Sequence, residues 1–542
     1  MTSSPETVRD ATFEVMRAHG LTTVFANPGS TEVPFLGGLP EDMRFVLGLH
    51  ESAVVGMATG WAIARREAAF VLVHTTAGLG NAVSAIATAR VNRAPLVVLV
   101  GQQDRRHLAQ EPFLTGRLAG LAGDYPVWVG QPARAQDVPG ALARARHEAE
   151  SARGPALVIV PMDDWLGPAP EPHELAAPAV AVRDPRPDPA AVERLQVMID
   201  EASRPALVVG AGADSEEAWG ALVTLAERLG CPVWQESFGA RAGFPHDHAL
   251  FAGHLPAGRA RLRDALAGHD LVLAVGAPVF RQYPYEPGPF VAEGTRLALV
   301  TDDPAEAHRS PVELAVIADP AAVAAALASS VSERPRAHGD PGANANGVPA
   351  APDPPGPGEP LRASHVLGEL GARLAPEAVV IEEAPSNRPE LLERLPARRP
   401  LGFLSPAMGG LGFALPGAIG VRMALPERPV VAVVGDGSAM FGIQSLWSAP
   451  RYDAGALFVI LSNGGYRVMD RLAEMQGEAA PWPEFGQVDV AAMARALGCP
   501  AVRVESHDEL TSTFDDVVPG LAGRAEPLLV EAIVSPDPDF NP

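Results

Sequence analysis

The chain has 542 residues, of which 47% are hydrophobic and 20% are charged, enough for about three domains of roughly 150 residues each. Its 42 basic and 65 acidic residues give a net charge of −23, which argues against nucleic acid or an anionic membrane as a partner. The sequence contains no lysine, so Schiff-base chemistry through lysine and the phosphate-binding lysine of a P-loop are both excluded.

Neither a targeting signal nor a cysteine metal site is evident. No apolar run reaches the ~18 residues of a membrane span, and the first residues lack the basic and apolar stretches of a signal peptide. The two cysteines, Cys231 and Cys499, stand far apart without metal-site spacing, which is typical of reduced cysteines in a cytoplasmic enzyme. We therefore expect a cytoplasmic protein with neither a membrane nor a nucleic-acid partner.

Apolar strands alternate with helices in the first part of the chain. A helix near Val8–His19 precedes a short strand at Thr23–Phe25, and further strands follow at Phe70–Val73 and Leu96–Val100, with Ala-rich helices between them. This alternation predicts an α/β domain with a parallel sheet. We place this first domain at residues 1–180, ending in a Pro-rich linker.

A second α/β domain is predicted at residues 188–330. Its expected strands are Ala206–Gly210, Pro232–Glu236, Leu271–Val275 and Leu297–Thr301. The Gly-Ala-Gly turn at 210–212 resembles the start of a dinucleotide-binding fingerprint, but the fingerprint is not completed at Ser215, so we interpret it as a structural turn. Residues 331–360 are rich in proline and glycine and predict a flexible linker.

The most informative pattern lies in the last domain, which we place at residues 361–542. Apolar strands at Val430–Val434 and Ala456–Leu461 flank a helix expected from about Met440 to Tyr452. In such a βαβ unit the strands are parallel, and their carboxyl ends share one edge of the sheet. Asp436 and Asn463 follow these two strands and should therefore lie side by side at the edge where α/β folds bind ligands.

The residue types at this edge indicate a metal and an anion. A carboxylate and an amide oxygen are hard ligands that suit Mg²⁺ or Ca²⁺. The glycines at 435 and 437 let backbone N–H groups approach an anion, and the start of the following helix favours negative charge. Together these features predict a metal-bridged diphosphate.

This pattern resembles a known family signature. The run Gly435-Asp436-Gly437-Ser438, followed by Ser462-Asn463, is similar to the thiamin diphosphate signature, with Ser462 in place of the first of two asparagines. The resemblance extends over nearly the whole chain, to the thiamin diphosphate-dependent 2-oxo acid decarboxylases, and is closest to benzoylformate decarboxylases. It rests on the segments Asn27–Glu32, Leu49–Ala53, His74–Gly78, Gly276–Arg281 and Gly409–Pro416.

The resemblance implies a fold, a cofactor and an activity. It implies three domains with parallel sheets flanked by helices, binding thiamin diphosphate with Mg²⁺ or Ca²⁺. Thiamin diphosphate is an electron sink that requires no lysine. The implied reaction is non-oxidative decarboxylation of an aromatic 2-oxo acid such as benzoylformate to an aldehyde and CO₂. Because one chain supplies a glutamate to its neighbour's cofactor in this family, at least a homodimer is implied, and a tetramer is expected.

Three residues of the first domain receive catalytic roles from the resemblance. Glu51 corresponds to the carboxylate at N1′ of the aminopyrimidine, His74 to an active-site acid–base residue, and Ser30 to a hydroxyl that binds the substrate carboxylate. The residues alone leave other interpretations open. Glu51 suits the start of any helix, His74 a structural hydrogen bond, and Ser30 a helix N-cap. His50 has no assigned role and is interpreted as structural.

The remaining implied roles lie in the third domain. The cofactor would be held by the Gly409 carbonyl at the aminopyrimidine, the bulky Leu411 that keeps the cofactor bent, and, at the diphosphate, Ser386, Gly435, Gly437 and Ser438. The metal would be held by Asp436, Asn463 and the backbone oxygen of Gly465.

Three positions depart from the benzoylformate enzymes. Tyr283 stands where these enzymes carry a second histidine, and Val468 and Leu472 replace a small and an aromatic pocket residue. Tyrosine has a pKa near ~10 and shuttles protons poorly at neutral pH, which favours a carboligase forming a 2-hydroxyketone as the alternative activity. A nicotinamide dehydrogenase using the 210–212 turn and a cofactor-binding but inactive protein are further alternatives.

Overall fold

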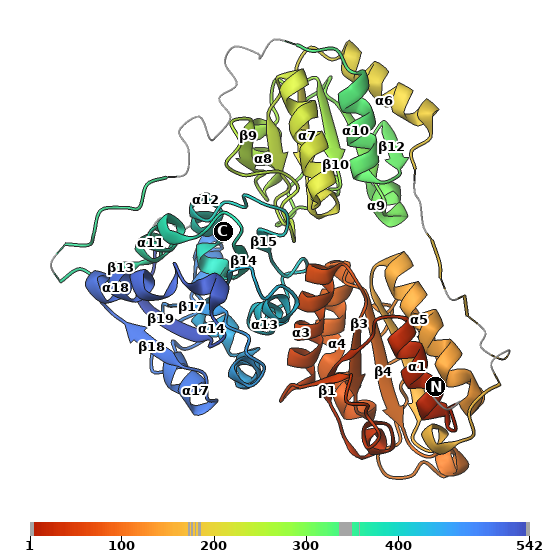
Figure 1. The fold of residues 1–542 in the computed structure, drawn as a ribbon. Coiled ribbons are helices and arrows are strands. Elements are labelled where there is room, and N and C mark those ends of the chain that lie inside the picture. Colours follow the sequence, from red (N-terminus) through yellow and green to blue (C-terminus); the bar gives the residue numbers. More distant parts are fainter. Residues whose placement is uncertain are drawn as a thin grey trace.

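The computed structural model describes residues 5–171, 174, 177–178, 180–182, 186–334, 349–356 and 358–537. Within these residues the chain forms three parallel β-sheets, each flanked by helices and each belonging to a separate lobe (Figure 1). The predicted α/β class with three parallel-sheet domains is confirmed. Residues 335–348 and 357 of the predicted flexible linker, and part of the Pro-rich stretch before residue 188, lie outside the described residues.

The first domain has the strand order β2-β1-β3-β4-β6-β5. Its strands are β1 Thr23–Asn27, β2 Arg44–Leu47, β3 Ala69–Val73, β4 Leu96–Gln102, β5 Trp128–Gly130 and β6 Pro155–Pro161. Its helices are α1 Val8–Ala18, α2 Val33–Leu36, α3 Glu51–Arg65, α4 Thr75–Val91 and α5 Val138–Ala152. Strands β3 and β4 are buried along their whole length, because helices cover both faces of a parallel sheet.

The middle domain has the strand order β12-β11-β10-β7-β8-β9. Its strands are β7 Pro205–Val209, β8 Val233–Gln235, β9 Phe251–His254, β10 Leu271–Val275, β11 Arg296–Thr301 and β12 Leu314–Ile317. Its helices are α6 Pro189–Glu201, α7 Glu216–Leu229, α8 Arg259–Ala265, α9 Pro304–Arg309 and α10 Pro320–Ser330. The four predicted strands of this domain are present as β7, β8, β10 and β11, with each end within one residue of its expected position.

The third domain has the strand order β13-β19-β17-β16-β14-β15, with β18 paired to β19. Its strands are β13 Leu361–Arg362, β14 Val379–Glu383, β15 Phe403–Leu404, β16 Val430–Gly435, β17 Leu457–Ser462, β18 Ala501–Val504 and β19 Leu528–Ser535. Its helices are α11 Ala363–Arg373, α12 Arg388–Arg394, α13 Ala414–Ala424, α14 Asp436–Ala439, α15 Ser448–Arg451, α16 Arg467–Met475, α17 Val490–Ala496 and α18 His507–Val517. None of the described helices is both long and apolar enough to cross a membrane.

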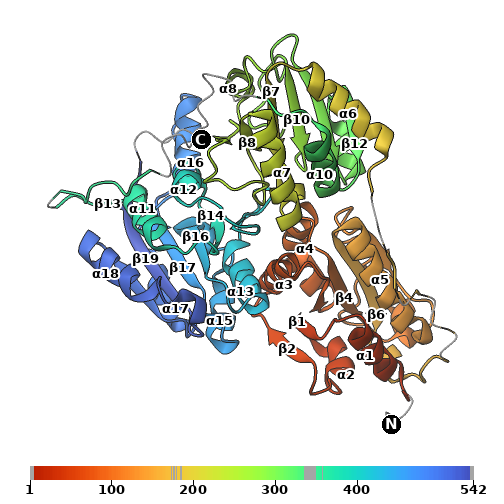
Figure 2. The ribbon, with the colours of Figure 1, turned by 45° about the horizontal axis from the view of Figure 1, so that its top comes forward.

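Helices α3 and α13 join the first and third domains at a very close crossing, which Figures 1 and 2 both show. A Cβ atom on Gly420 would overlap the Met57 carbonyl oxygen, and one on Gly60 would overlap the Gly417 carbonyl oxygen. Glycine on both helices therefore lets the two backbones touch. The two domains share one hydrophobic core, in which residues of the first sheet pack with residues of the third.

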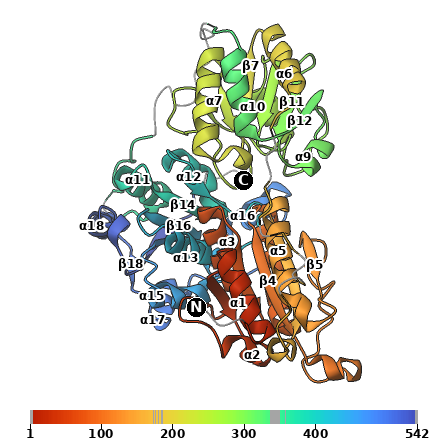
Figure 3. The same ribbon diagram turned by 45° about the vertical axis from the view of Figure 1, so that its right-hand side comes forward.

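The middle domain is attached to the other two by buried carboxylates. Asp302 forms ion pairs with Arg93 and Arg153 of the first domain, with both N–O distances at 2.6 Å. Asp214 accepts from the Leu401 N–H of the third domain at 2.7 Å and pairs with Arg241 at 3.2 Å. Figure 3 shows this domain seated above the first and third domains. These ties hold all three domains in one arrangement.

We expect Gly420→Ala to lower the stability of the protein, because the new methyl group must push apart the backbones of α3 and α13. Overpacking of this kind costs about 1–3 kcal/mol or more. The matched control is Gly220→Ala in α7, where an added Cβ atom meets no other atom within 4 Å. Alanine in an open helix position stabilises by about 0.4–1 kcal/mol. Apparent melting temperatures of the two variants should therefore move in opposite directions.

Candidate functional site

The predicted βαβ unit is present, and it brings Asp436 and Asn463 to one sheet edge. Strands β16 and β17 pair in parallel, with Gly435 opposite Leu461. The Asp436 Oδ2 atom accepts a hydrogen bond from the Gly464 N–H at 2.7 Å, which ties the two loops together. The expected juxtaposition of these loops is thus confirmed.

The helix expected between these strands is broken, which corrects the sequence prediction. Helix α14 ends at Ala439, a 3₁₀ segment (η9) covers Ile443–Trp447, and α15 begins only at Ser448. A Cβ atom on Gly442 would lie 3.1 Å from the Gly412 carbonyl oxygen, so the chain leaves the helical path where it meets the 409–412 loop. The break therefore places the β16 turn against another loop of the same domain.

Asp436 has the environment of a metal ligand. Its side chain is 4% exposed, and burial raises the pKa of this carboxyl group, although backbone N–H groups of Gly464, Gly437 and Asn463 limit the rise. A cation at this carboxylate would offset the cost of burying its charge. Asn463 lies on the facing loop, where its Oδ1 atom accepts from the Gly465 N–H at 3.2 Å. Gly465 is itself buried.

The turn beside Asp436 fits an anionic ligand. In the described structure no side-chain cap hydrogen bond is made at the N-terminus of α14, although the Gly437 N–H donates to Asp436 Oδ1 at 2.8 Å, and a helix start favours negative charge. Ser438 is buried within the same turn. No group of three or more His, Cys, Asp or Glu side chains that could hold a metal occurs among the described residues. One carboxylate plus neutral oxygens suits Mg²⁺, which commonly completes its shell with phosphate and water. The residues present therefore fit a magnesium–diphosphate group.

Gly437 lies beneath two aromatic rings. A Cβ atom on this residue would lie 2.6 Å from Tyr466 Cε1 and 3.2 Å from Phe485 Cζ. Glycine is therefore required by the close approach of these rings to the turn. Both rings belong to the segment after Asn463, so this segment covers the β16 turn.

The loop that carries Gly409 and Leu411 is held by a buried glutamate that the sequence analysis missed. Glu383, at the carboxyl end of β14, accepts from the N–H groups of Gly412, Phe413 and Ala414 at 2.6, 2.8 and 2.7 Å. Burial raises the pKa of Glu383 to about 7, and these three hydrogen bonds oppose the rise. Its place at a strand's carboxyl edge was the only available signal.

A second missed residue, Asn92, fixes the same loop from the first domain. Its Oδ1 atom accepts from the Ala407 N–H at 2.7 Å, and its Nδ2 atom donates to the Ser405 carbonyl at 2.9 Å. A Cβ atom on Gly410 would lie 3.2 Å from Thr88 Oγ1 of α4. The Gly409–Leu411 loop is therefore positioned by contacts from both domains.

Ser386 does not belong to α16 but lies beside the first turn of that helix. Its hydroxyl oxygen accepts from the Val468 N–H at 3.1 Å, within the first turn of that helix. The structure thereby brings together Ser386, expected at the diphosphate, and Val468, expected in the substrate pocket. Leu472, one helical turn later, is half-buried like Val468.

His74 belongs to a hydrogen-bonded cluster at the edge of the first sheet. The Nδ1 atom of its ring lies 3.0 Å from the Glu32 carboxylate and 2.9 Å from the Thr31 hydroxyl. Glu32 is 1% exposed and also accepts from the Gly29 N–H at 2.7 Å. The role of Glu32 was missed, although it lies within the Asn27–Glu32 motif. Glu32 fixes the orientation of the imidazole ring.

Ser30 and His50 have different local roles from one another. Ser30 begins the 3₁₀ turn η1 (Ser30–Glu32) with an exposed side chain, and Gly29 occupies the cap position. The alternative that Ser30 is a helix N-cap is therefore wrong. His50 does cap α3, because its Nδ1 atom accepts from the Ser52 N–H at 3.2 Å. The structural interpretation of His50 agrees with this contact.

Glu51 starts α3 and is 8% exposed. Its Oε2 atom accepts from the Asn81 side-chain amide at 3.0 Å. Among the described residues, no hydrogen bond joins Glu51 to the loops of Asp436 or Asn463. The predicted catalytic groups of the first domain and the predicted cofactor groups of the third domain therefore form two separate clusters within one chain.

Tyr283 lies outside both clusters in the described structure. Its side chain is 59% exposed, and its N–H donates to the Ala257 carbonyl at 3.2 Å, within the middle domain. No described hydrogen bond or ring contact connects its phenol to the first or third domain.

The glycine turn of the middle domain is filled by its own backbone. The Gly212 N–H donates to the Gly276 carbonyl at 2.8 Å, and a Cβ atom on Gly212 would lie 2.8 Å from Gly276 Cα. The buried Glu236 side chain also adjoins Gly210, where a Cβ atom would lie 2.7 Å from its Oε1 atom, so little room is left for a dinucleotide phosphate. These contacts support the interpretation as a structural turn and argue against the dehydrogenase alternative.

Three models of thiamine pyrophosphate enzyme domains match the chain. The N-terminal TPP-binding domain matches residues 6–117, the central domain residues 192–327, and the C-terminal TPP-binding domain residues 390–532. The chain is also 41% identical to a benzoylformate decarboxylase of Pseudomonas aeruginosa, over 97% of this chain and 98% of that protein.

Solved structures show the same similarity. A thiamine diphosphate-dependent 4-hydroxybenzoylformate decarboxylase of Rhodococcus jostii superposes with a TM-score of 0.91 and 36% identity, covering 98% of this chain and 99% of that one. A benzoylformate decarboxylase of Polynucleobacter necessarius gives a TM-score of 0.93 and 32% identity, covering 99% and 100%. The chain therefore belongs to the thiamine pyrophosphate enzyme family. Within that family, these matches place it beside the benzoylformate decarboxylases.

We expect Glu236→Gln to stabilise the protein at alkaline but not at acidic pH. Burial raises the pKa of Glu236 from 4.5 to about 7, so the native state holds a proton that the unfolded chain releases. Stability contributed by this proton is full below about pH 4.5 and is lost as the pH rises through about 7, by up to about 3 kcal/mol. Apparent melting temperatures of both proteins at about pH 5 and about pH 8 should show the difference only at the higher pH.

Replacing Glu383 by glutamine should loosen the Gly409–Leu411 loop. The amide has a single acceptor oxygen, so its NH₂ group would face at least one backbone N–H and leave it unpaired, at a cost of about 1–3 kcal/mol. Glu377→Gln, an exposed change in the same domain, is the control. The apparent melting temperature should fall by a few degrees for Glu383→Gln alone, and an equal fall for both would contradict the role of Glu383.

Proposed function

We propose that this protein is a thiamin diphosphate- and Mg²⁺-dependent decarboxylase that converts an aromatic 2-oxo acid such as benzoylformate to an aldehyde and CO₂. The observation that carries the proposal is the parallel β16–β17 pair, which sets the buried Asp436 beside the Asn463 loop. The 41% identity to a benzoylformate decarboxylase over nearly the whole chain supports the substrate class. A cytoplasmic location remains a prediction.

The third domain would hold the cofactor. Asp436, the Asn463 amide and the Gly465 carbonyl would bind Mg²⁺, and Gly435, Gly437, Ser438 and Ser386 would contact the diphosphate. The Gly409 carbonyl would accept from the aminopyrimidine, and Leu411 would hold the cofactor bent. Glu383, at the carboxyl end of β14, and Asn92, in the first domain, hold this loop through hydrogen bonds to its backbone. When bound, thiamin diphosphate takes up the electron pair that remains after CO₂ leaves.

The first domain would handle the protons. Glu51 would exchange a proton with the aminopyrimidine. Glu32 holds the Nδ1 atom of His74, which would leave Nε2 to give or take a proton. The exposed Ser30 hydroxyl would bind the substrate carboxylate, and Val468 and Leu472 would form the apolar wall for the aromatic ring.

We further infer that a complete site needs two chains. Among the described residues, the side-chain hydrogen bonds of Glu51 stay within the first domain and those of Asp436 within the third. Apolar side chains lie exposed near each cluster: Leu49 near Glu51 is 44% exposed, and Phe441 near Asp436 is 53% exposed. Apposition of the first domain of one copy to the third domain of another would cover both, giving a homodimer, and two dimers would form a tetramer.

A carboligase remains the second candidate, and Tyr283 is the observation that favours it. Phenol is a poor proton donor at neutral pH compared with imidazole, so protonation of the product would slow. Capture by a second carbonyl compound would then compete. A 2-hydroxyketone in place of free aldehyde would identify this activity.

Purified protein supplied with thiamin diphosphate and Mg²⁺ should release benzaldehyde from benzoylformate. Glu51→Gln should lower kcat by about 100-fold to 10,000-fold, the range expected for loss of a proton-transfer group. Glu67→Gln, an exposed change just beyond α3, should not alter kcat. Coupled spectrophotometric detection of the aldehyde measures the rates. Undiminished activity of Glu51→Gln would overturn the mechanism, and cofactor binding without aldehyde would point to another 2-oxo acid.

A further inference from the structure

The segment that follows Asn463 forms a flap over the cofactor turn. We define the flap as residues 464–486, which include α16. No residue of α16 is buried. The flap is closed at its base, because the Phe485 N–H donates to the Gly464 carbonyl at 2.9 Å. The rings of Tyr466 and Phe485 also meet at its base, 5.0 Å apart and tilted by 64°.

The base of the flap rests on the groups that would hold the metal and the diphosphate. Tyr466 and Phe485 lie directly over Gly437, and Gly464 donates to Asp436. Any change in the flap's position would therefore change the surroundings of Asp436 and Asn463. Because no residue of α16 is buried, packing alone does not hold the flap in place, and specific polar contacts must do so.

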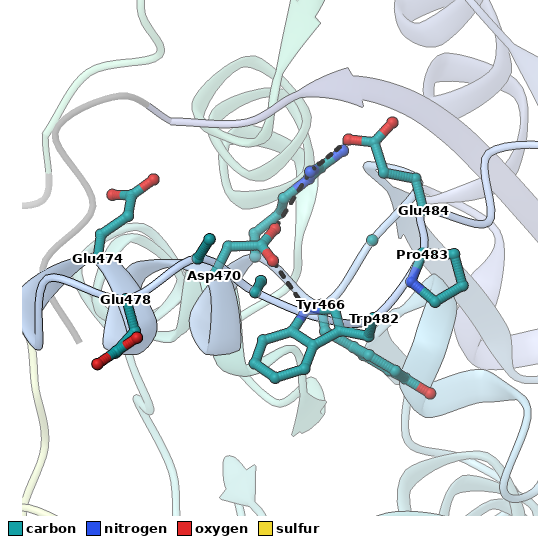
Figure 4. A pocket seen from close by; sticks show the side chains of 11 residues that line it. Tyr466, Asp470, Glu474, Glu478, Trp482, Pro483 and Glu484 are labelled. Atoms are coloured by element: carbon teal, nitrogen blue, oxygen red, sulfur yellow. Dashed lines mark hydrogen bonds and ion pairs between the residues drawn. The ribbon is translucent and has the colours of Figure 1, made fainter.

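Arg467 supplies those contacts. Its Nε and Nη2 atoms lie 3.3 and 3.0 Å from the Asn463 carbonyl oxygen. Its Nη1 atom donates to Asp470 at 3.2 Å and to Glu484 at 2.8 Å. The other oxygen of Asp470 accepts from the Trp482 indole at 2.9 Å (Figure 4). One guanidinium thus joins the Asn463 loop, helix α16 and the part of the flap after α16, which carries Glu484.

The planar fork of arginine is what makes this bridge possible. A guanidinium carries donors in fixed directions, whereas an ammonium group acts as a single point. The flap surrounds a cavity of about 320 Å³, whose lining includes Arg467, Asp470 and Trp482. Because each nitrogen of Arg467 already donates within the protein, binding of a substrate carboxylate would compete with these contacts.

We propose that Arg467 is a positioning residue that clamps the flap over the metal and diphosphate site and thereby controls how long the cofactor is retained. The inference rests on the proposed function. The contact with the Asn463 carbonyl fixes the backbone of a metal-binding residue, and partners of this kind are worth about 10-fold to 100-fold in metal affinity. The contact with Glu484, which is 75% exposed, adds little alone, since exposed pairs are weak.

The test compares Arg467→Met with Arg471→Met. Arg471 lies one turn later on α16 and forms its ion pair with the exposed Glu474, so its removal spares the Asn463 carbonyl. Each holoenzyme is transferred into buffer that contains a metal chelator, and the thiamin diphosphate left on the protein is measured over time. Arg467→Met should lose the cofactor about 10-fold to 100-fold faster than wild type, and Arg471→Met at the wild-type rate.

Two further measurements distinguish a role of Arg467 in holding the flap from a role in binding the substrate. With saturating cofactor and Mg²⁺, the KM of Arg467→Met for benzoylformate should equal that of wild type. In cofactor-free protein, a glutamate-specific protease should cleave the flap at Glu474 or Glu478 about tenfold faster in Arg467→Met than in Arg471→Met. This second reading does not depend on the proposed function.

Each contrary result overturns the clamp. Equal cofactor retention in both variants would overturn it, and so would a raised KM with unchanged retention, which would assign Arg467 to the substrate carboxylate. Equal protease cleavage would show that Arg467 does not hold the flap. If wild-type protein binds no thiamin diphosphate, the proposed function fails and the role in retention fails with it, even where the protease still distinguishes the variants.

Discussion

The close crossing of α3 and α13 is the contact on which the rest of the architecture depends. Glycines on both helices bring the backbones together, and the two parallel sheets then share a single core. The two ends of the crossing have functional consequences. Helix α3 begins at Glu51, and α13 begins directly after the loop of Gly409 and Leu411. A rigid crossing therefore fixes the direction in which Glu51 and the Gly409–Leu411 loop leave the core. Because this direction is fixed, the two segments need not meet within one chain.

The loops around the third-domain site are held by backbone hydrogen bonds to buried side chains more than by packing. Glu383 binds three consecutive N–H groups, Asn92 binds two backbone groups just after β15, and Asp436 binds the N–H of Gly464. Each of these acceptors lies at the carboxyl end of a strand or helix near the shared core. Such contacts specify loop conformation because an unpaired buried N–H is costly. A site that must accept a large anionic cofactor is thus prepared by the protein before the ligand arrives.

Much of the fold was predictable because local patterns determine it. The apolar runs of β16 and β17 gave their parallel pairing, and that pairing alone placed Asp436 beside the Asn463 loop. The broken helix between them was not predictable, because its break depends on the approach of Gly442 to Gly412. These two residues are distant in the sequence, so the local pattern of residues does not reveal their contact. Asn92 and Glu383 were missed because their partners are backbone groups, which leave no trace in the sequence, and Glu32 was missed because its partner His74 lies 42 residues away along the chain. The ties between Ser386 and Val468 and between Arg467 and Asn463 likewise appear only once the loops are folded.

The absence of lysine gives these contacts a common character. Every cationic tie in the described structure that joins elements through side chains uses arginine or histidine, and arginine can bind several acceptors in one plane. Arg422 of α13 donates to the carbonyls of Arg428, Ala522 and Arg524, and thereby ties α13 to two other segments of the third domain. Arg467 uses the same geometry at the flap, where carbonyl and carboxylate acceptors converge from three directions. An ammonium group gathers its donors on one nitrogen, whereas the guanidinium spreads them over three nitrogens in a plane, which lets it reach acceptors that lie on different elements.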